Sequence, residues 1–327
     1  MWARNKFQVL AVLALLLSFN AAAAAQNGDD KDDKKKRAPD GTPVLWREPA
    51  DIGARDLRHG AGGAAGRPDL SNVTFLKEEK GGFSTKYRVR DGAGREWVVK
   101  VGKEAQSETA ATRLLWAVGY PTEIVHLAPR VRIRGKGTFE NARFEARPKA
   151  IDRAGEWSWE ENPFTDTREF QGLKVMMVLL NNWDIKDSNN VILHVPRDGR
   201  DELHYAISDL GATLGKTGRW PGLWRFTRSR NDPEGFTGDR FIDEIKDDGR
   251  VDFHFSGKKR GMFNDITVED ARWIGSWLAR LSDRQLGDAF RAANYTPSEV
   301  RAYTRAIRWR INQLANLDRT TQRARRN

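Results

Sequence analysis

The sequence predicts an α+β chain in which a part rich in β-strands precedes a mainly helical part. Short runs of alternating or β-branched residues, separated by glycine turns, follow one another over residues 73–101. After residue 165, four segments carry apolar residues at helical spacing, and the last three open with a capping pattern. The chain has 327 residues, including 15 Phe and 12 Trp, which is enough for two lobes with cores of their own.

The amino-terminal residues 1–25 have the pattern of a secretory signal peptide. Two basic residues, Arg4 and Lys6, precede a short apolar run, and alanines end the segment. We therefore expect cleavage after Ala25 and an exported protein that is periplasmic or secreted. The apolar run is shorter than the roughly 20 residues that span a bilayer, so no transmembrane span is expected after cleavage; the alternative is an uncleaved anchor.

Composition excludes several classes of protein and site. The chain has no Cys, which rules out a disulfide scaffold, a thiol nucleophile and a Cys-ligated zinc site. Its five His residues are scattered, without the paired spacing of a His-based zinc centre. The net charge of +11 indicates a basic protein that can make peripheral contact with anionic surfaces.

Composition also suggests boundaries between regions. Residues 26–43 are expected to form a disordered charged linker, because the stretch 27–37 contains no apolar side chain. An N-terminal extension and the β-rich lobe should follow over 44–150, the helical lobe over 151–318, and a basic tail over 319–327.

The β-rich lobe should contain five strands and one helix. The helix is expected over 105–118, where apolar residues recur at helical spacing, and Gly119 is a suitable residue to end it. The strands are expected at 73–77, 86–90, 96–101, 131–133 and 142–146.

The helical lobe should begin with a helix that is capped by Thr165 or Thr167 and runs through Leu180. Two strands follow at 191–195 and 204–207, and residues 215–261 should be mostly loop with short elements. Three further helices, each opened by Ser or Thr with an acidic residue or Gln close behind, are expected at 267–281, 282–292 and 296–317.

Two features of the β-rich lobe could hold phosphate groups. The first hairpin reads Gly81-Gly82-Phe83-Ser84-Thr85-Lys86, and the backbone N–H groups of a glycine turn can cradle phosphate oxygens; otherwise it is an ordinary hairpin. Lys100 ends an apolar strand and must find an anion or reach the surface. Glu108, which opens the following helix, is the expected partner of Lys100, and Glu104 is a rival.

The loop that follows the first helix of the helical lobe has residues suited to phosphoryl transfer. It reads NWDIKDSN and carries Asp184, Lys186 and Asn189. These supply a carboxylate to accept a hydroxyl proton, a cation for the phosphoryl group and an amide oxygen for a metal. Asp187 also competes for the role of base, and the structural alternative is a polar turn.

Asp209 is placed to bind a divalent metal ion. It follows the apolar strand 204–207 within Ser-Asp-Leu-Gly, and a carboxylate at a strand end is a natural Mg²⁺ ligand; otherwise the turn simply ends the strand. Along the chain the order is a glycine loop, a strand Lys, a helix Glu, a D-x-x-x-x-N loop and a D-x-G turn. A fixed order of such features is harder to explain by chance than any one of them.

This order resembles the protein-kinase-like superfold, an α+β fold with a β-rich N-lobe and a mainly helical C-lobe. Residues 184–189 look like its catalytic loop, and Ser-Asp-Leu-Gly looks like its metal-binding DFG turn. The stretch from Glu108 to Tyr120 is similar to the E-x-A-A-x-x-L-x-x-x-x-G helix of the atypical branch, which includes HipA-like, secretory-pathway (Fam20-like) and phosphatidylinositol kinase-like proteins. The resemblance covers roughly residues 73–215 and suggests an exported bacterial-type member.

By position, the resemblance implies an ATP pocket between the two lobes. Lys100, paired with Glu108, would bind the α- and β-phosphates, and Asp184 would be the catalytic Asp. Lys186 would steady the transferred phosphoryl group, while Mg²⁺ or Mn²⁺ would be held by Asn189 and Asp209. The phosphate loop would comprise Gly81, Gly82, Ser84 and Lys86. The chain departs from typical kinases in lacking a G-x-G-x-x-G loop and an APE segment, and in having DLG for DFG and Asn-Trp for His-Arg.

The expected activity is transfer of the ATP γ-phosphate to a hydroxyl on a protein, a lipid or a glycan; which acceptor it is, and the oligomeric state, are left open. One alternative is a catalytically inactive kinase-fold scaffold of the cell envelope. Another is a basic binder of anionic polymer, suggested by RWPGLWRFTRSR at 219–230, where Arg alternates with Trp and Phe. In a kinase, Arg219, Arg225, Arg228 and Arg230 of that stretch could instead draw an anionic acceptor. Nucleic acid is not an expected partner, because no readout motif accompanies this stretch.

Overall fold

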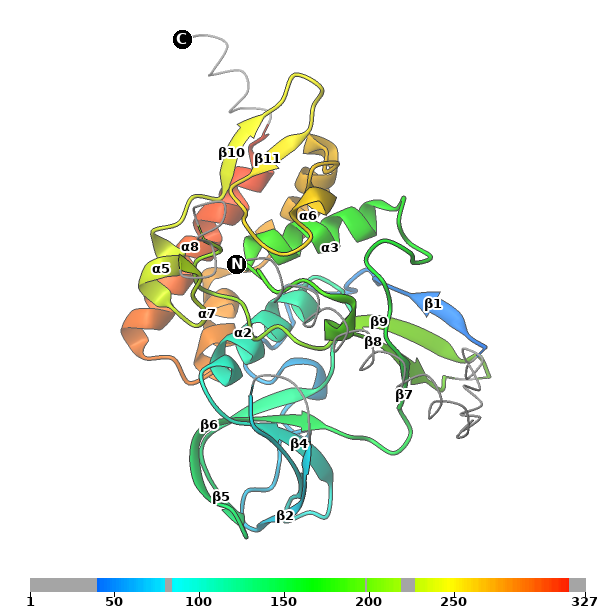
Figure 1. Cartoon of the computed structure of the whole chain (residues 1–327), viewed down its shortest axis with the longest axis vertical. Coiled ribbons are helices and arrows are strands. Elements are labelled where there is room, and N and C mark those ends of the chain that lie inside the picture. The colour runs from blue at the N-terminus through cyan, green and yellow to red at the C-terminus, as the bar shows by residue number, and fades with distance from the viewer. Residues whose placement is uncertain (1–39, 80–83, 198, 219–226, 318–327) are drawn as a thin grey trace, which may run out of the picture. The chain divides into compact units, whose positions relative to one another are not determined.

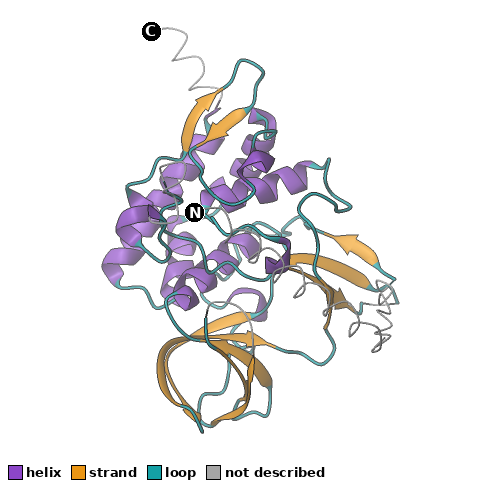
Figure 2. Cartoon of the chain, in the orientation of Figure 1, coloured by secondary structure: helices purple, strands orange, loops and turns teal. Residues whose placement is uncertain are grey.

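The structure, a computed structural model, describes residues 40–79, 84–197, 199–218 and 227–317. Within these stretches, strands gather in the first part of the chain and helices in the second, which confirms the predicted α+β class (Figures 1 and 2). The signal peptide and the basic tail lie outside the described residues. None of the helices described in these stretches is long and apolar enough to cross a membrane.

The β-rich lobe is a closed five-stranded barrel with strand order β2-β3-β4-β6-β5 (Figure 1). Only β2 and β5 pair in parallel; the other neighbours are antiparallel. The strands are β2 (Val73–Glu79), β3 (Lys86–Arg90), β4 (Glu96–Lys100), β5 (Val125–Arg134) and β6 (Gly137–Ala146). The last two are ten residues each and longer than predicted, because charged side chains on their outer face interrupt the apolar pattern.

Helix α2 (Glu104–Ala117) lies between the barrel and the helical lobe, where it contacts β5, β6 and α7 (Asp283–Ala292). Its predicted start at residue 105 is off by one residue. Nearly all of its side chains are buried, and its apolar residues belong to the core of the helical lobe. The N-terminal extension joins the same core through Leu45, Ile52 and Leu57, although the sequence grouped it with the barrel.

Gly119 ends α2 as predicted, with a φ of +102°. A Cβ at this position would collide with the backbone carbonyl of Arg47 in the N-terminal extension. Gly94 is a matched comparison, because its φ is +80° and a Cβ would meet nothing within 4 Å.

Gly119→Ala is therefore expected to cost about 3 kcal/mol of unfolding free energy or more, whereas Gly94→Ala should cost about 1–2 kcal/mol for its backbone conformation alone. Chemical denaturation of both variants measures the difference. Equal losses would mean that the extension moves away from α2 without cost.

A second sheet has four strands in the order β1-β9-β8-β7. The strands are β1 (Thr42–Val44), β7 (Asp152–Gly155), β8 (Asn190–Val195) and β9 (Glu202–Ile207). The sequence predicted β8 and β9 but not the two short outer strands. Strand β1 pairs in parallel with β9 and begins at Thr42, inside the stretch predicted as linker.

The helices of the second lobe begin where the capping residues predict. Thr167, rather than Thr165, caps α3 (Arg168–Leu179) by accepting a hydrogen bond from the backbone N–H of Phe170. All three predicted capping boxes are formed, at α6 (Val268–Ala279), α7 (Asp283–Ala292) and α8 (Pro297–Ala315). Residues 215–261, predicted to be mostly loop, contain only short elements where they are described: α5 (Pro233–Thr237), β10 (Ile242–Ile245), β11 (Val251–Phe253) and the start of a 3-10 helix (Arg260–Phe263).

Candidate active site

A polar cleft of about 540 Å³ lies between the barrel and the helical lobe. Most of the residues that the sequence singled out line it: Ser84, Lys86, Lys100, Asp184, Lys186, Asn189 and Asp209. Glu108 lies directly behind Lys100 in the interior. Gly81 and Gly82 lie outside the described residues.

Lys100 is buried at the centre of a cluster of three carboxylates. Its Nζ lies 2.7 Å from Glu108 Oε2, 3.3 Å from Asp209 Oδ1 and 3.6 Å from Glu104 Oε2. Of the two partners left open by the sequence, Glu108 is therefore the closer one. The contact with Asp209 joins the barrel to the helical lobe at the residue expected to bind metal.

Glu108 is wholly buried and has a second cationic partner. Its Oε1 lies 3.0 Å from Nη1 of Arg143, which stands directly opposite Lys100 in the register of β4 and β6. Burial raises the pKa of the Glu108 carboxyl above its ordinary value, although Arg143 and Lys100 act in the opposite direction. Glu108 is thus fixed by two cations, and its ion pair with Lys100 fixes the position of the Lys100 ammonium group.

Glu104 is a second link between the lobes. Its Oε2 accepts a 2.5 Å hydrogen bond from the Ser84 hydroxyl, and its Oε1 forms an ion pair with Arg230. The turn after Asp209 approaches this side chain so closely that a Cβ at Gly211 would lie 2.8 Å from the Cβ of Glu104. Glycine at the last position of the D-x-G turn thus allows the turn to pack against α2.

The loop that carries Asp184 is anchored from the interior of the helical lobe. Arg310 of α8 is fully buried and donates 2.8 Å hydrogen bonds to the carbonyl of Leu179 and to Asn181 Oδ1. Burial lowers the pKa of Arg310 to about 10. Asn181 in turn donates to the carbonyl of Gly215 at 2.7 Å. The start of the loop is therefore held by side chains that the sequence did not single out.

Asp184 faces the cleft between two lysines. Its Oδ1 lies 2.6 Å from Nζ of Lys258, and its Oδ2 lies 3.0 Å from Nζ of Lys186. Asp187 does not line the cleft; it accepts from the backbone N–H of Trp159 and lies 3.3 Å from Nζ of Lys259. Of these two carboxylates, Asp184 is the one that lines the cleft.

Asn189 and Asp209 are held next to each other with oxygens available for a metal ion. The carbonyl of Asn189 accepts from the backbone N–H of Ser208 at 2.8 Å and of Asp209 at 3.1 Å. The Nδ2 of Asn189 donates to the Asp184 carbonyl at 2.7 Å. The Oδ1 of Asn189 is not used in this hydrogen bond and could contact a metal ion. A carboxylate and an amide oxygen, completed by phosphate oxygens and water, fit Mg²⁺. The described residues contain no cluster of three or more His, Cys, Asp or Glu that could hold a metal by themselves.

Two titratable groups in the cleft respond to their neighbours. Burial tends to raise the pKa of Asp209, but Lys100 and the backbone N–H of Gly211 outweigh it and hold the pKa below its ordinary value. Burial, reinforced by Lys100, lowers the pKa of Lys86. Asp209 is thereby kept as the anion that a metal ion requires.

Sequence reasoning missed a set of charged residues that line the cleft, namely Arg143, Glu145, Arg147, Arg153 and Lys258. The first three alternate along β6 and its exit, so all of them project from one face of the strand. That alternation was visible within the predicted strand 142–146, where it reads as a solvated face. Lys258 had no signal, since it lies in a region of weak periodicity.

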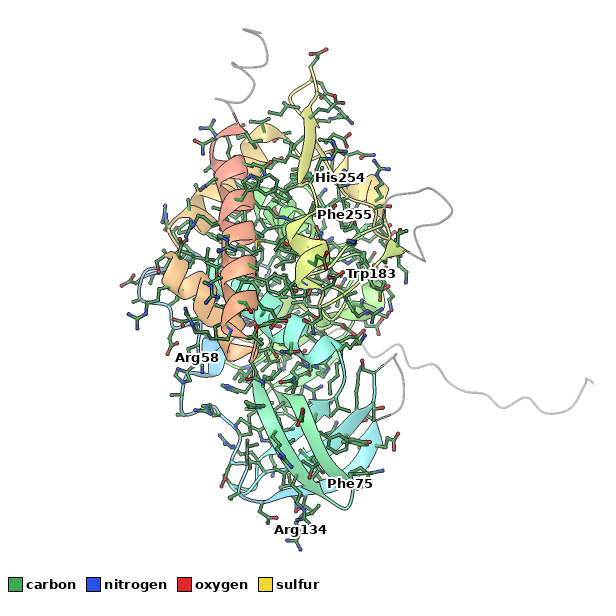
Figure 3. The ribbon with its side chains drawn as sticks, turned by 90° about the vertical axis from the view of Figure 1, so that its left-hand side faces the viewer. Arg58, Phe75, Arg134, Trp183, His254 and Phe255 are labelled. Atoms are coloured by element: carbon green, nitrogen blue, oxygen red, sulfur yellow. The ribbon has the colours of Figure 1, made fainter. Side chains whose placement is uncertain are left out.

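A second pocket, of about 850 Å³, adjoins the cleft and shares Ser84, Glu104, Trp183, Arg230 and Lys258 with it. Figure 3 shows Trp183 between the barrel that bears Phe75 and the region of Phe255. The guanidinium groups of Arg228 and Arg230 lie over the Trp183 ring, at 5.1 Å and 4.7 Å from its centre. Of the basic stretch 219–230, these two arginines line the second pocket; Arg219 and Arg225 lie outside the described residues.

No protein-family model and no curated protein matches the chain. Among solved structures it is similar to the Helicobacter pylori proinflammatory kinase CtkA, at 10% identity and a TM-score of 0.43, over 75% of this chain and 92% of that chain. It is also similar to the Rio2 kinase of Chaetomium thermophilum in an ADP/Mg²⁺-phosphoaspartate complex, at 14% identity and a TM-score of 0.34, over 76% of this chain and 74% of that one. A third is the kinase domain of maize sucrose-induced receptor kinase 1 bound to AMP-PNP, at 12% identity and a TM-score of 0.23, over 83% of this chain and 99% of that one. Each of these three solved structures is of a kinase.

Proposed function

We propose that the protein is a kinase-like phosphotransferase that moves the γ-phosphate of ATP to a hydroxyl acceptor with the help of Mg²⁺ or Mn²⁺. The observation that carries this proposal is the set of side chains that line one cleft. It brings together a buried ammonium group on Lys100, a carboxylate on Asp184 and two oxygen donors on Asn189 and Asp209. Phosphoryl transfer relies mainly on positioning and charge stabilisation, and these groups supply both.

The residues of the cleft suggest how the transfer proceeds. Asp184 accepts the proton of the acceptor hydroxyl as its oxygen forms a bond to the γ-phosphorus; the bond from that phosphorus to the β–γ bridging oxygen breaks, and ADP leaves with the electron pair. Lys186 and Lys258 flank Asp184 and can neutralise charge on the phosphoryl group. Lys100 holds the inner phosphates, and Lys86 stands opposite it in the register of β3 and β4. A divalent ion between Asn189 and Asp209 would neutralise charge on the phosphates when bound.

The second pocket is the proposed entrance for the acceptor. Among its described lining residues, the cationic ones are Lys103, Arg228, Arg230 and Lys258, and the acidic one is Glu104. An acceptor that carries negative charge near its hydroxyl fits this lining. We also propose that the protein works outside the cytoplasm, on the basis of its amino-terminal sequence pattern.

Thermal unfolding of the purified protein with ATP and Mg²⁺ or Mn²⁺ tests nucleotide binding. A ligand at about 100 times its Kd adds about 2.7 kcal/mol to the free energy of unfolding, which raises Tm by a few degrees at this size. The rise should require metal and should disappear in Asp209→Asn. It should persist in Asp152→Asn, an exposed carboxylate of β7 that does not line the cleft.

Transfer of radiolabelled γ-phosphate, to water or to the protein itself, separates the alternatives. A metal-dependent rise in Tm together with transfer supports the phosphotransferase. A rise in Tm without transfer to water, to the protein or to any acceptor in a screen favours the inactive scaffold. No rise with any nucleotide contradicts the phosphotransferase, favours a scaffold that does not bind nucleotide, and makes anionic polymers the next ligands to test.

A further inference from the structure

One end of the cleft is built from charged side chains that pair with one another. In the register of β4 and β6, Val98 stands opposite Glu145 just as Lys100 stands opposite Arg143. Residues at alternate positions project to the same face of a sheet, so Arg143 and Glu145 both face the cleft. The part of the cleft wall that β6 contributes is therefore charged rather than apolar.

The pairing at this end is extensive and largely buried. Glu145 Oε2 lies 2.7 Å from Nη2 of Arg143, and Glu145 Oε1 forms an ion pair with Arg147 and lies 3.6 Å from Nη1 of Arg153. Side-chain exposure is only 3% for Arg143 and 4% for Glu145. This group, hereafter the paired end, leaves few apolar atoms facing the cleft.

Arg153 connects the paired end to the helical lobe. It forms an ion pair with Glu123 and donates a 3.0 Å hydrogen bond to the hydroxyl of Ser208, the residue before Asp209. The same hydroxyl donates to Glu123 Oε2 at 2.9 Å. Arg153, Ser208 and Glu123 thus form a connected set of hydrogen bonds and ion pairs beside the paired end.

Outside the paired end, the described lining of the cleft has an excess of positive charge. Among the described residues that line the cleft, eight side chains are cationic and four are acidic; the cations are Lys86, Lys100, Arg143, Arg147, Arg153, Lys186, Arg230 and Lys258, and the acids are Glu104, Glu145, Asp184 and Asp209. The positive and negative charges of the paired end nearly cancel once Glu108 and Glu123, which pair with its arginines, are included. The excess therefore lies around Lys86, Lys186 and Lys258, where a phosphate chain would be attracted.

A nucleobase needs a flat apolar or aromatic surface and a few hydrogen-bonding groups to be distinguished from other bases. Among the described lining residues, only Val98, Trp183 and Ala212 are apolar, and the last two lie beside Asp184. At the paired end a base would meet Val98, guanidinium planes and a small pocket of about 50 Å³ that shares Arg147 and Arg153 with the cleft and has apolar residues in its lining. Stacking on such planes tolerates any base, because every base has a π-face.

We infer that the phosphoryl donor is recognised through its phosphate chain and that the nucleobase contributes little to binding. The inference rests on the proposed function and names its donor class: purine and pyrimidine nucleoside triphosphates alike, and inorganic tripolyphosphate. With tripolyphosphate, the bond from the terminal phosphorus to its bridging oxygen breaks and diphosphate leaves with the electron pair. The acceptor oxygen forms the new bond to phosphorus, and its proton passes to Asp184.

Titration calorimetry of the full chain with the Mg²⁺ complexes of ATP, GTP, CTP and tripolyphosphate tests the inference. The four dissociation constants are expected to lie within about tenfold of one another. Binding of ATP more than about 100-fold tighter than GTP, CTP and tripolyphosphate overturns the inference and leaves the proposed function standing. Binding of tripolyphosphate alone overturns the inference, because nucleoside triphosphates belong to the inferred donor class, and it contradicts ATP as donor; binding of none of the four overturns both the inference and the proposed function.

Two variants locate the recognition within the cleft. Lys86→Met removes a cation from the phosphate end and is expected to weaken all four ligands by a common factor of about tenfold. Arg153→Met changes the paired end, while Glu123 keeps Arg147 at 3.5 Å and the Ser208 hydroxyl. The ratio of the ATP and tripolyphosphate constants should not change in Arg153→Met. A fall in ATP affinity alone would show that the paired end reads the base, which contradicts the inference.

Discussion

Replacing Asp184 with Asn is expected to slow phosphoryl transfer by about 10²- to 10⁴-fold, while Tm stays within about 2 °C of wild type. The amide keeps the shape of the side chain but cannot accept the hydroxyl proton. Folding should be spared because both lysine partners of Asp184 are more than 40% exposed and can be hydrated. The measurement is the initial rate of γ-phosphate release from ATP, alongside a thermal melt.

Asp187→Asn is the matched control for this experiment. Asp187 is three residues away in the same loop, but it pairs with Lys259 outside the cleft. Transfer should therefore stay within a few-fold of wild type in this variant. If Asp187→Asn is inactive and Asp184→Asn is active, the base has been assigned to the wrong carboxylate. Loss of the cooperative unfolding transition in Asp184→Asn would instead show that the residue is structural.

Replacing Arg143 with Met is expected to lower the free energy of unfolding by about 3–5 kcal/mol, or to lower Tm by about 10 °C. Its guanidinium bridges Glu108 at 3.0 Å and Glu145 at 2.7 Å, and all three side chains are buried. Without it, two buried carboxylates lose a cation that they share. Lys186→Met, at the half-exposed mouth of the cleft, should change the unfolding free energy by less than about 1 kcal/mol.

The effect of Arg143→Met should depend on pH in a defined direction. Burial already raises the pKa of Glu108 in the wild type, and removing Arg143 takes away one group that opposes this rise. A carboxyl whose pKa is higher in the folded state contributes stability at low pH and loses it as the pH rises through the folded-state pKa. The destabilisation relative to wild type should therefore be larger at pH 8 than at pH 5, as measured by urea unfolding at both. A variant equal to wild type at pH 8 would mean that water hydrates these carboxylates.

Local rules were sufficient for the secondary structure of most of the chain. Strands β2, β3 and β4, the helix after them and the capped helices of the second lobe follow from glycine turns, apolar spacing and capping residues. The short strands β1 and β7 were missed because their pairing partners, β9 and β8, lie far away in the sequence. Three- or four-residue strands have no periodicity to detect and exist only through such pairing.

The polar residues of the cleft also fall into two groups, those that local sequence patterns indicated and those that only long-range packing brings there. The sequence indicated four of them, which lie in two short loops where residues close in the chain are also close in space: Asp184, Lys186, Asn189 and Asp209. Lys100 and Glu108 were found because a lysine at the end of an apolar strand needs an anion. What the sequence by itself determined is therefore the α+β class, the main elements and the order of these groups.

Only the tertiary structure decided which charges meet. Strand register sets Arg143 opposite Lys100, and packing of α2 selects Glu108 as the closest partner while Glu104 pairs with Arg230. Lys258 reaches Asp184 from 74 residues away in the chain. A charged side chain looks the same in sequence whether water or another charge surrounds it. Its partner is fixed by long-range packing, because an ion pair forms wherever burial brings the two groups within a few ångströms.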